Sequence, residues 1–82
     1  DKIFTTKISQ HQGCLFEIGL LARYDGIKRW WRVEVRLLDM NGHSVENGDI
    51  VLDQQFAEVA IADEAGVTAA HRLVEERLSV PG

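Results

Sequence analysis

The sequence predicts an α+β domain in which an antiparallel meander of four or five strands packs one face against a C-terminal helix. Apolar and polar residues alternate through two long segments of the first half, and glycine-containing turn signals separate the segments. Helical periodicity is confined to the last third of the chain. A length of 82 residues suits one domain, residues 1–82, with a single modest core.

The first three strands are expected from alternation and from turn residues. β-branched and aromatic residues are frequent from Lys2 to Ser9, which favours an extended segment. After a polar break, alternation from Cys14 to Tyr24 predicts a long second strand. Asp25-Gly26 is a strong turn signal, and a third strand should follow from about Lys28 to Asp39.

The third strand carries both tryptophans and three arginines in the run Arg29 to Arg36. Because side chains alternate along a strand, Trp31 should enter the core while Trp30 points to the opposite face. One helix cannot cover both faces of a sheet, and tryptophan and arginine are enriched at interface hot spots. The alternative is that the N-terminal segment or charged side-chain stems cover Trp30. The predicted binding residues on the opposite face are Trp30, Arg32, Arg36, Leu15, Leu21 and Leu38.

Two registers compete for the hairpin between the second and third strands. A two-residue loop at Asp25-Gly26 would place Glu17 opposite Glu34, which is repulsive. A four-residue loop, Asp25 to Lys28, instead sets Glu17 against Arg36 and is favoured. The favoured register also pairs Leu15 with Leu38 and Arg23 with Trp30.

The second half of the chain should complete the sheet and then form the helix. Asn41-Gly42 and Asn47-Gly48 predict two further turns, with short strands from His43 to Val45 and from Asp49 to Asp53. Phe56 is expected to return to the core.

The helix is expected to begin near Ala62, because Asp63 and Glu64 suit the positive end of its dipole. Gly66 is its one poor helix former. A competing interpretation is a single helix from Asp53 to Leu78, which would place Asp63 on the apolar stripe. The residues expected to face the sheet are Val67, Ala70, Leu73, Val74 and Leu78.

Chemistry-bearing motifs are sparse. His11-Gln12-Gly13-Cys14 brings an imidazole and a thiol close together, but a structural zinc site needs four ligands and the chain has a single cysteine. Cys14 is therefore interpreted as a small apolar residue at a strand start. No metal, no cofactor and no catalytic residue are expected, and an enzyme with an unrecognised site ranks third among the possible functions.

Composition bounds the partners and the compartment. The net charge of −4 disfavours nucleic acid, because phosphate binding requires a basic footprint. No run approaches the ~20 apolar residues of a membrane span, so no membrane partner is expected. The single cysteine excludes an intramolecular disulfide and favours a reducing compartment, with the cytoplasm as the default.

A family resemblance rests on Gly13-Cys14-Leu15-Phe16-Glu17-Ile18, then Trp31-Arg32-Val33-Glu34-Val35, then Phe56, and Ala62-Asp63-Glu64-Ala65 opening a final helix. This order resembles small bacterial proteins of uncharacterised function and, more loosely, HicB-like domains. The resemblance covers about Gly13 to Leu78 and implies a sheet followed by a helix. For HicB-like antitoxins it would also imply a toxin partner and operator binding, but the chain has no identifiable added DNA-binding segment.

The leading functional hypothesis is a non-enzymatic protein-interaction module that uses the face carrying Trp30 to bind either a protein partner or a second copy of itself. The alternative is a nucleic-acid-binding regulator that would use the same face, stacking bases on Trp30 and holding phosphates with arginines. Glu17 and Glu34 oppose that alternative, because each would repel a phosphate.

Overall fold

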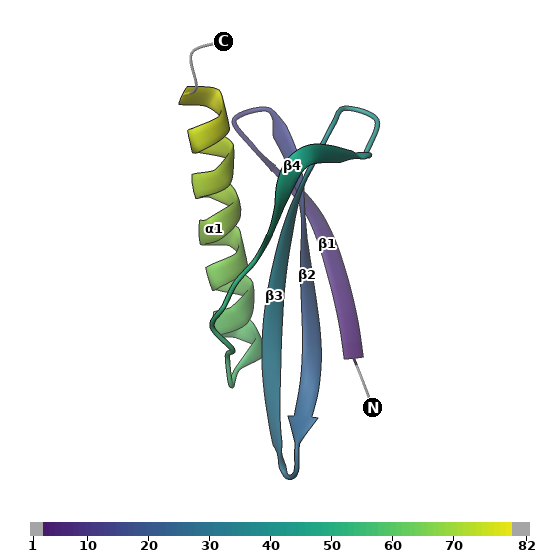
Figure 1. Ribbon diagram of the computed structural model, residues 1–82, viewed down its shortest axis with the longest axis vertical. Coiled ribbons are helices and arrows are strands. Elements are labelled where there is room, and N and C mark those ends of the chain that lie inside the picture. Colours follow the sequence, from purple (N-terminus) through teal and green to yellow (C-terminus); the bar gives the residue numbers. More distant parts are fainter. Residues whose placement is uncertain (1–2, 80–82) are drawn as a thin grey trace.

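The computed structural model describes residues 3–79 and has the α+β architecture expected from the sequence (Figure 1). Lys2, at the start of the first predicted strand, and the last residues, 80–82, lie outside the described part. Each strand pairs antiparallel with the next, in the order β1-β2-β3-β4, and the helix packs on one face of the sheet over β2 and β3. The elements are β1 (Ile3–His11), β2 (Cys14–Asp25), β3 (Lys28–Leu38), β4 (Ser44–Val51) and α1 (Val59–Ser79).

The β2–β3 register confirms the prediction that was based on charge pairing. Glu17 lies opposite Arg36, and the remaining predicted pairs follow from the same alignment. The strands continue one pair further than expected, to Asp25 and Lys28, so that Gly26 and the next residue alone form the turn. Gly26 has a φ of 67°, a conformation that glycine adopts without strain.

The core lies between α1 and the inner faces of β2 and β3. Alternate side chains of β2 and β3 point into the core, as the sequence predicts, and Trp31 is only 7% exposed. Among the side chains that the structure describes, β1 contributes none to this buried cluster. The buried residues are Phe16, Ile18, Leu20, Ala22, Trp31, Val33, Val35, Leu37, Phe56, Ala62, Ala70 and Val74.

The prediction of two short strands after β3 is wrong, because a single strand, β4, forms in their place. Asn47-Gly48 does not reverse the chain but lies inside β4, where the register shifts and Asn47 has a φ of 58°. A Cβ at Gly48 would lie 3.0 Å from the Cβ of Leu37, so β4 crosses β3 too closely there for a side chain. After β4, Phe56 reaches the core as expected and exchanges two backbone hydrogen bonds with Trp31, at 2.7 and 2.9 Å.

The helix starts at Val59, three residues before the predicted Ala62, and the competing helix from Asp53 is wrong. Its buried residues recur every four positions, at Ala62, Gly66, Ala70 and Val74. The expectation that Leu78 faces the sheet is also wrong, because this side chain is 54% exposed. The last turn of α1 lies near the β1–β2 turn, beyond the central part of the sheet (Figure 1).

Gly66 marks the closest approach of α1 to the sheet. A Cβ on this residue would lie 2.8 Å from Cγ2 of Ile18 and 3.0 Å from Cγ1 of Val33. Both neighbours are buried and fully packed, so they cannot move aside easily. Packing therefore requires glycine at position 66, although glycine is a poor helix former.

We predict that Gly66→Ala destabilises the fold, although alanine favours a helix by about 1 kcal/mol relative to glycine. Overpacking against Ile18 and Val33 should cost about 1–3 kcal/mol and outweigh that gain. Urea denaturation monitored by circular dichroism measures the free energy of unfolding. Thr68→Ala, at an exposed position on the same helix, is the control and should raise it by at most about 0.7 kcal/mol, the gain in helix propensity alone. A Gly66→Ala protein more stable than the wild type would contradict this packing.

The loop between β3 and β4 is organised by Asp39. Its carboxylate accepts hydrogen bonds from the backbone amides of Asn41, at 2.8 Å, and His43, at 2.9 Å. The His43 amide, followed by that of Asn41, lowers the pKa of Asp39 from its ordinary value against an opposing contribution from desolvation. The charged form is therefore the one that holds the turn.

We predict that this loop loosens only in acid. Because the pKa of Asp39 is lowered in the folded chain, its contribution is fully present above the ordinary aspartate value of about 4 and disappears as the pH falls through the lowered pKa. NMR titration of the Asp39 carboxyl carbon and the His43 amide measures this. Asp39→Asn should abolish the acid transition at the amide. An Asp39 that titrates at or above the unfolded-peptide value would contradict the prediction.

Candidate interaction surface

The face of the sheet opposite α1 is the outer face, and among residues 3–79 no other element covers it (Figure 1). Strand pairing arranges its side chains in rows across the strands. From the β2–β3 turn upward, the first row holds Arg23 and Trp30, and the second holds Phe4, Leu21 and Arg32. The third row holds Thr6, Gly19, Glu34 and Val51, and the fourth holds Ile8, Glu17, Arg36 and Asp49.

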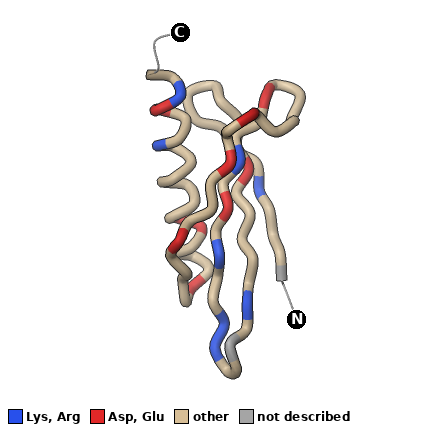
Figure 2. The backbone as a smooth tube through the Cα atoms, viewed as in Figure 1, with Lys and Arg blue, Asp and Glu red and all other residues tan. Residues whose placement is uncertain are grey.

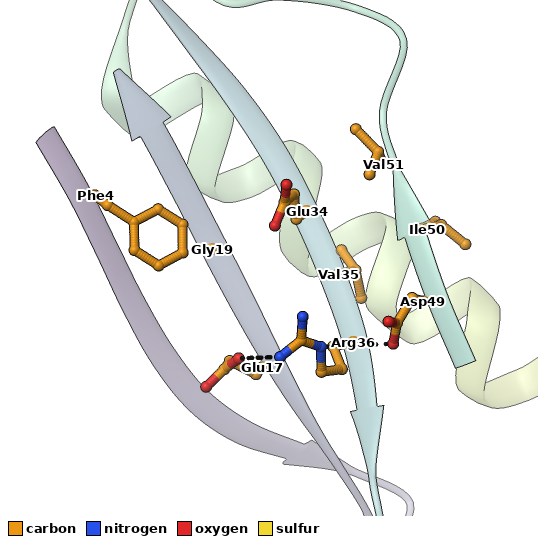
Figure 3. Close-up of a pocket in the computed structure, with 9 residues that line it drawn as sticks. All are labelled: Phe4, Glu17, Gly19, Glu34, Val35, Arg36, Asp49, Ile50 and Val51. Carbon is orange, nitrogen blue, oxygen red and sulfur yellow. Dashed lines mark ion pairs between the residues drawn. The ribbon is translucent and has the colours of Figure 1, made fainter. Parts of the chain in front are cut away.

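The ring of Phe4 lies across Gly19 near the middle of the outer face (Figure 3). A Cβ at Gly19 would come within 3.1 Å of Cζ of Phe4, so the missing side chain provides the notch in which the ring rests. Phe4 nevertheless remains 55% exposed. An aromatic side chain is thus held in place on an open surface.

Arg36 is held between two carboxylates. Its Nη1 lies 3.7 Å from Oε1 of Glu17, and its Nε lies 3.6 Å from Oδ1 of Asp49 (Figure 3). All three side chains are partly exposed, so water and salt screen these pairs and they add little stability. Their effect is to orient the guanidinium on the face.

A shallow hollow of about 430 Å³ opens beside these groups. Apolar side chains, three carboxylates and the guanidinium of Arg36 share its lining. Its lining comprises Phe4, Glu17, Gly19, Glu34, Val35, Arg36, Asp49, Ile50 and Val51 (Figure 3).

The structure places the six predicted binding residues on the outer face, with different exposures. Arg32 and Arg36 are exposed, and Trp30 is half-buried on the face opposite Trp31. Leu15 and Leu21 are also half-buried. Leu38 is only 9% exposed and offers little to a partner.

Sequence reasoning missed the contribution of β1 and β4 to this face, namely Phe4, Ile8, Val51 and Asp49. A signal for β1 was present in the short connection to β2. Gln12 and Gly13 have φ values of 51° and 82°, as a two-residue hairpin turn requires, and a hairpin closed there aligns Phe4 with Leu21.

Charge is divided along the outer face (Figure 2). The half near the β2–β3 turn carries Arg23 and Arg32, whereas the other half carries Glu17, Glu34 and Asp49 around Arg36. Among the described side chains, Arg32 and Glu34 form no ion pair within the chain. Their charges remain available to a partner.

Two of the three histidines, His11 and His71, lie on the inner side, away from this surface. The rings of His11 and His71 stack with centroids 3.9 Å apart, and Nε2 of His11 lies 2.9 Å from Oε2 of Glu75. Within the described part of the chain, no three His, Cys, Asp or Glu side chains converge so that they could hold a metal ion. The contacts of His11 with His71 and Glu75 join the end of β1 to α1.

No family model matches the chain, and neither a curated protein nor a solved structure matches it. The resemblance to HicB-like domains therefore stays a hypothesis. In residues 3–79, α1 lacks the apolar length that a helix needs to cross a membrane.

We predict that the two tryptophans differ in access to solvent, because Trp31 is buried and Trp30 is partly open. In Trp31→Phe, where Trp30 alone remains, acrylamide should quench the fluorescence more strongly than in Trp30→Phe. The emission maximum of Trp30 should also lie at longer wavelength. Circular dichroism of both variants checks that the fold is retained. Equal quenching of the two variants would contradict their placement on opposite faces.

Proposed function

We propose that the protein is a protein-interaction module whose partner is a second copy of the same chain, bound outer face to outer face. The observation that carries the proposal is the division of charge on this face. A symmetric pair in which the strands of the two copies run in opposite directions brings the basic half of each copy over the acidic half of the other.

The rows of the face allow this pairing to be worked out residue by residue. A two-fold axis lying across the strands, between the second and third rows, exchanges those two rows and also the first with the fourth. Arg32 then faces Glu34 of the partner copy, and Arg23 faces the partner's Glu17. Trp30 faces the partner's Arg36, a combination that favours a cation–π contact.

The centre of such an interface would be apolar. Phe4 and Leu21 occupy the second row and Gly19 the third, so the axis passes beside the ring that rests on Gly19. Buried aromatic residues at the centre of a charged rim are typical of interface hot spots. With strands ~4.8 Å apart and ~3.3 Å per residue, the face measures roughly 20 by 30 Å. Its projected area falls below the ~800 Å² per partner of a standard interface, so the association should be weak.

The same distribution argues against nucleic acid as the partner of this face. Three arginines, at positions 23, 32 and 36, are balanced by three carboxylates, at 17, 34 and 49. A phosphate backbone would be repelled by the acidic half, whereas a second copy uses both halves. Because the charges of the outer face are complementary to themselves, a second copy is favoured over nucleic acid as its partner.

We predict that Arg32→Glu and Glu34→Arg each weaken self-association, because each variant sets like charges against one another twice in the symmetric pair. The dissociation constant of the dimer should rise by about tenfold in each variant, which corresponds to ~1.4 kcal/mol for the two repulsive contacts together. The double variant Arg32→Glu/Glu34→Arg should recover association. Sedimentation velocity over a concentration series measures these constants.

A mixture of the two single variants supplies a further test. In the mixture, positions 32 and 34 are both acidic in one copy and both basic in the other. The two variants together should therefore associate more strongly than either variant alone. Glu76→Arg, an exposed charge reversal on α1, is the control and should leave self-association unchanged. A concentration-independent monomer for the wild type, or variants indistinguishable from it, would overturn the proposal.

A further inference from the structure

The segment that forms β4, the connection to α1 and the first half of α1 is entirely acidic in its charges. Residues 37–71 contain no lysine or arginine, although they include seven Asp and Glu residues. The described basic residues lie in the other strands and in the second half of the helix (Figure 2). Arg72 also borders this side and Arg36 pairs with Asp49, but the carboxylates outnumber these two cations, so the charge favours a basic partner.

Strand β4 also leaves main-chain groups unpaired. It is the last strand in the order β1-β2-β3-β4, and among residues 3–79 no strand pairs with its other edge. The amide of Leu52 donates to the carbonyl oxygen of Val33 at 3.0 Å, on the β3 side. Because bonding alternates along an antiparallel strand, the amide and carbonyl of Val51 point away from β3, toward the open edge.

An apolar groove runs beside this edge, between β4 and α1. It encloses about 580 Å³ and is lined by Leu52, Ile61, Ala65, Ala69, Thr68, Glu64 and Arg72. A smaller hollow of about 240 Å³ shares Leu52, Ala69 and Arg72 with it and is completed by Ile50, Leu73 and Glu76. The methyl side chains of Ala65 and Ala69 leave the space open along the helix.

Edge and groove fit together as one binding site. Ile50 on β4 and Leu52, the residue after the strand, pack against the core, while Asp49 and Val51 alternate to the outer face. An added strand would follow the same alternation, so its side chains opposite Ile50 and Leu52 would enter the groove. Its intervening side chains would stand beside Asp49 and Asp53, at the acidic rim.

We propose that the β4 edge binds an extended segment of another protein as an additional antiparallel strand. The segment would carry apolar side chains at alternate positions, seated between β4 and α1, and lysine or arginine between them. This inference goes beyond the proposed self-association, because it uses the edge and the helix groove rather than the outer face.

The test uses the full chain and a fluorescein-labelled hexapeptide of alternating valine and lysine, with binding measured by fluorescence anisotropy. A valine–glutamate hexapeptide should bind at least about tenfold more weakly because of the acidic rim. In the antiparallel arrangement, the lysine amides bond to the edge and the valine amides point away. N-methylation of the lysine amides should therefore abolish binding, whereas N-methylation of the valine amides should preserve it.

A matched pair of helix variants locates the site. Ala69→Leu fills the groove and should weaken the valine–lysine peptide by about tenfold or more, whereas Ala60→Leu makes the same change at an exposed helix position outside the groove and should not. Arg32→Glu should bind the peptide normally, which separates this site from the self-association surface. The inference is overturned by absence of binding, by equal binding of the two methylated peptides or of the two charge types, or by insensitivity to Ala69→Leu.

Discussion

The close packing of Gly66 against Ile18 and Val33 is the constraint on which the rest of the architecture depends. Because the backbone of α1 comes down directly onto β2 and β3, the helix lies over the centre of the sheet. The flanking strands β1 and β4 are left as edges, and a single helix leaves the second face open. Both of the proposed binding surfaces exist because the helix is placed centrally.

Patterns that repeat along the chain were sufficient to predict most of this architecture. Alternation identified the inward residues of β2 and β3, and the pairing of Glu17 with Arg36 selected the hairpin register. Both arguments are local or involve neighbouring strands, where sequence separation is small. The same alternation separated Trp30 from Trp31, so the open face and its arginines could be anticipated.

The errors arose where contacts between distant residues decide the conformation. Asn47-Gly48 is a common turn signal, but the close crossing at Leu37 makes it an irregularity inside β4. The position of Phe4 over Gly19 depends on the β1–β2 alignment, and the edge groove requires β4 and α1 to be adjacent. A single sequence does not contain these distances, although the lack of basic residues from 37 to 71 was visible in it.

Strand β1 is attached in a different way from the other strands. Its described side chains add nothing to the buried cluster, and its links to α1 are polar, between Lys7 and Asp63 at 2.8 Å and through the stacked His11. Peeling β1 away therefore exposes little apolar surface while uncovering the edge of β2 and the Gly19 notch. Strand β1 is consequently the element whose release costs the least burial, so local opening of this fold should begin there.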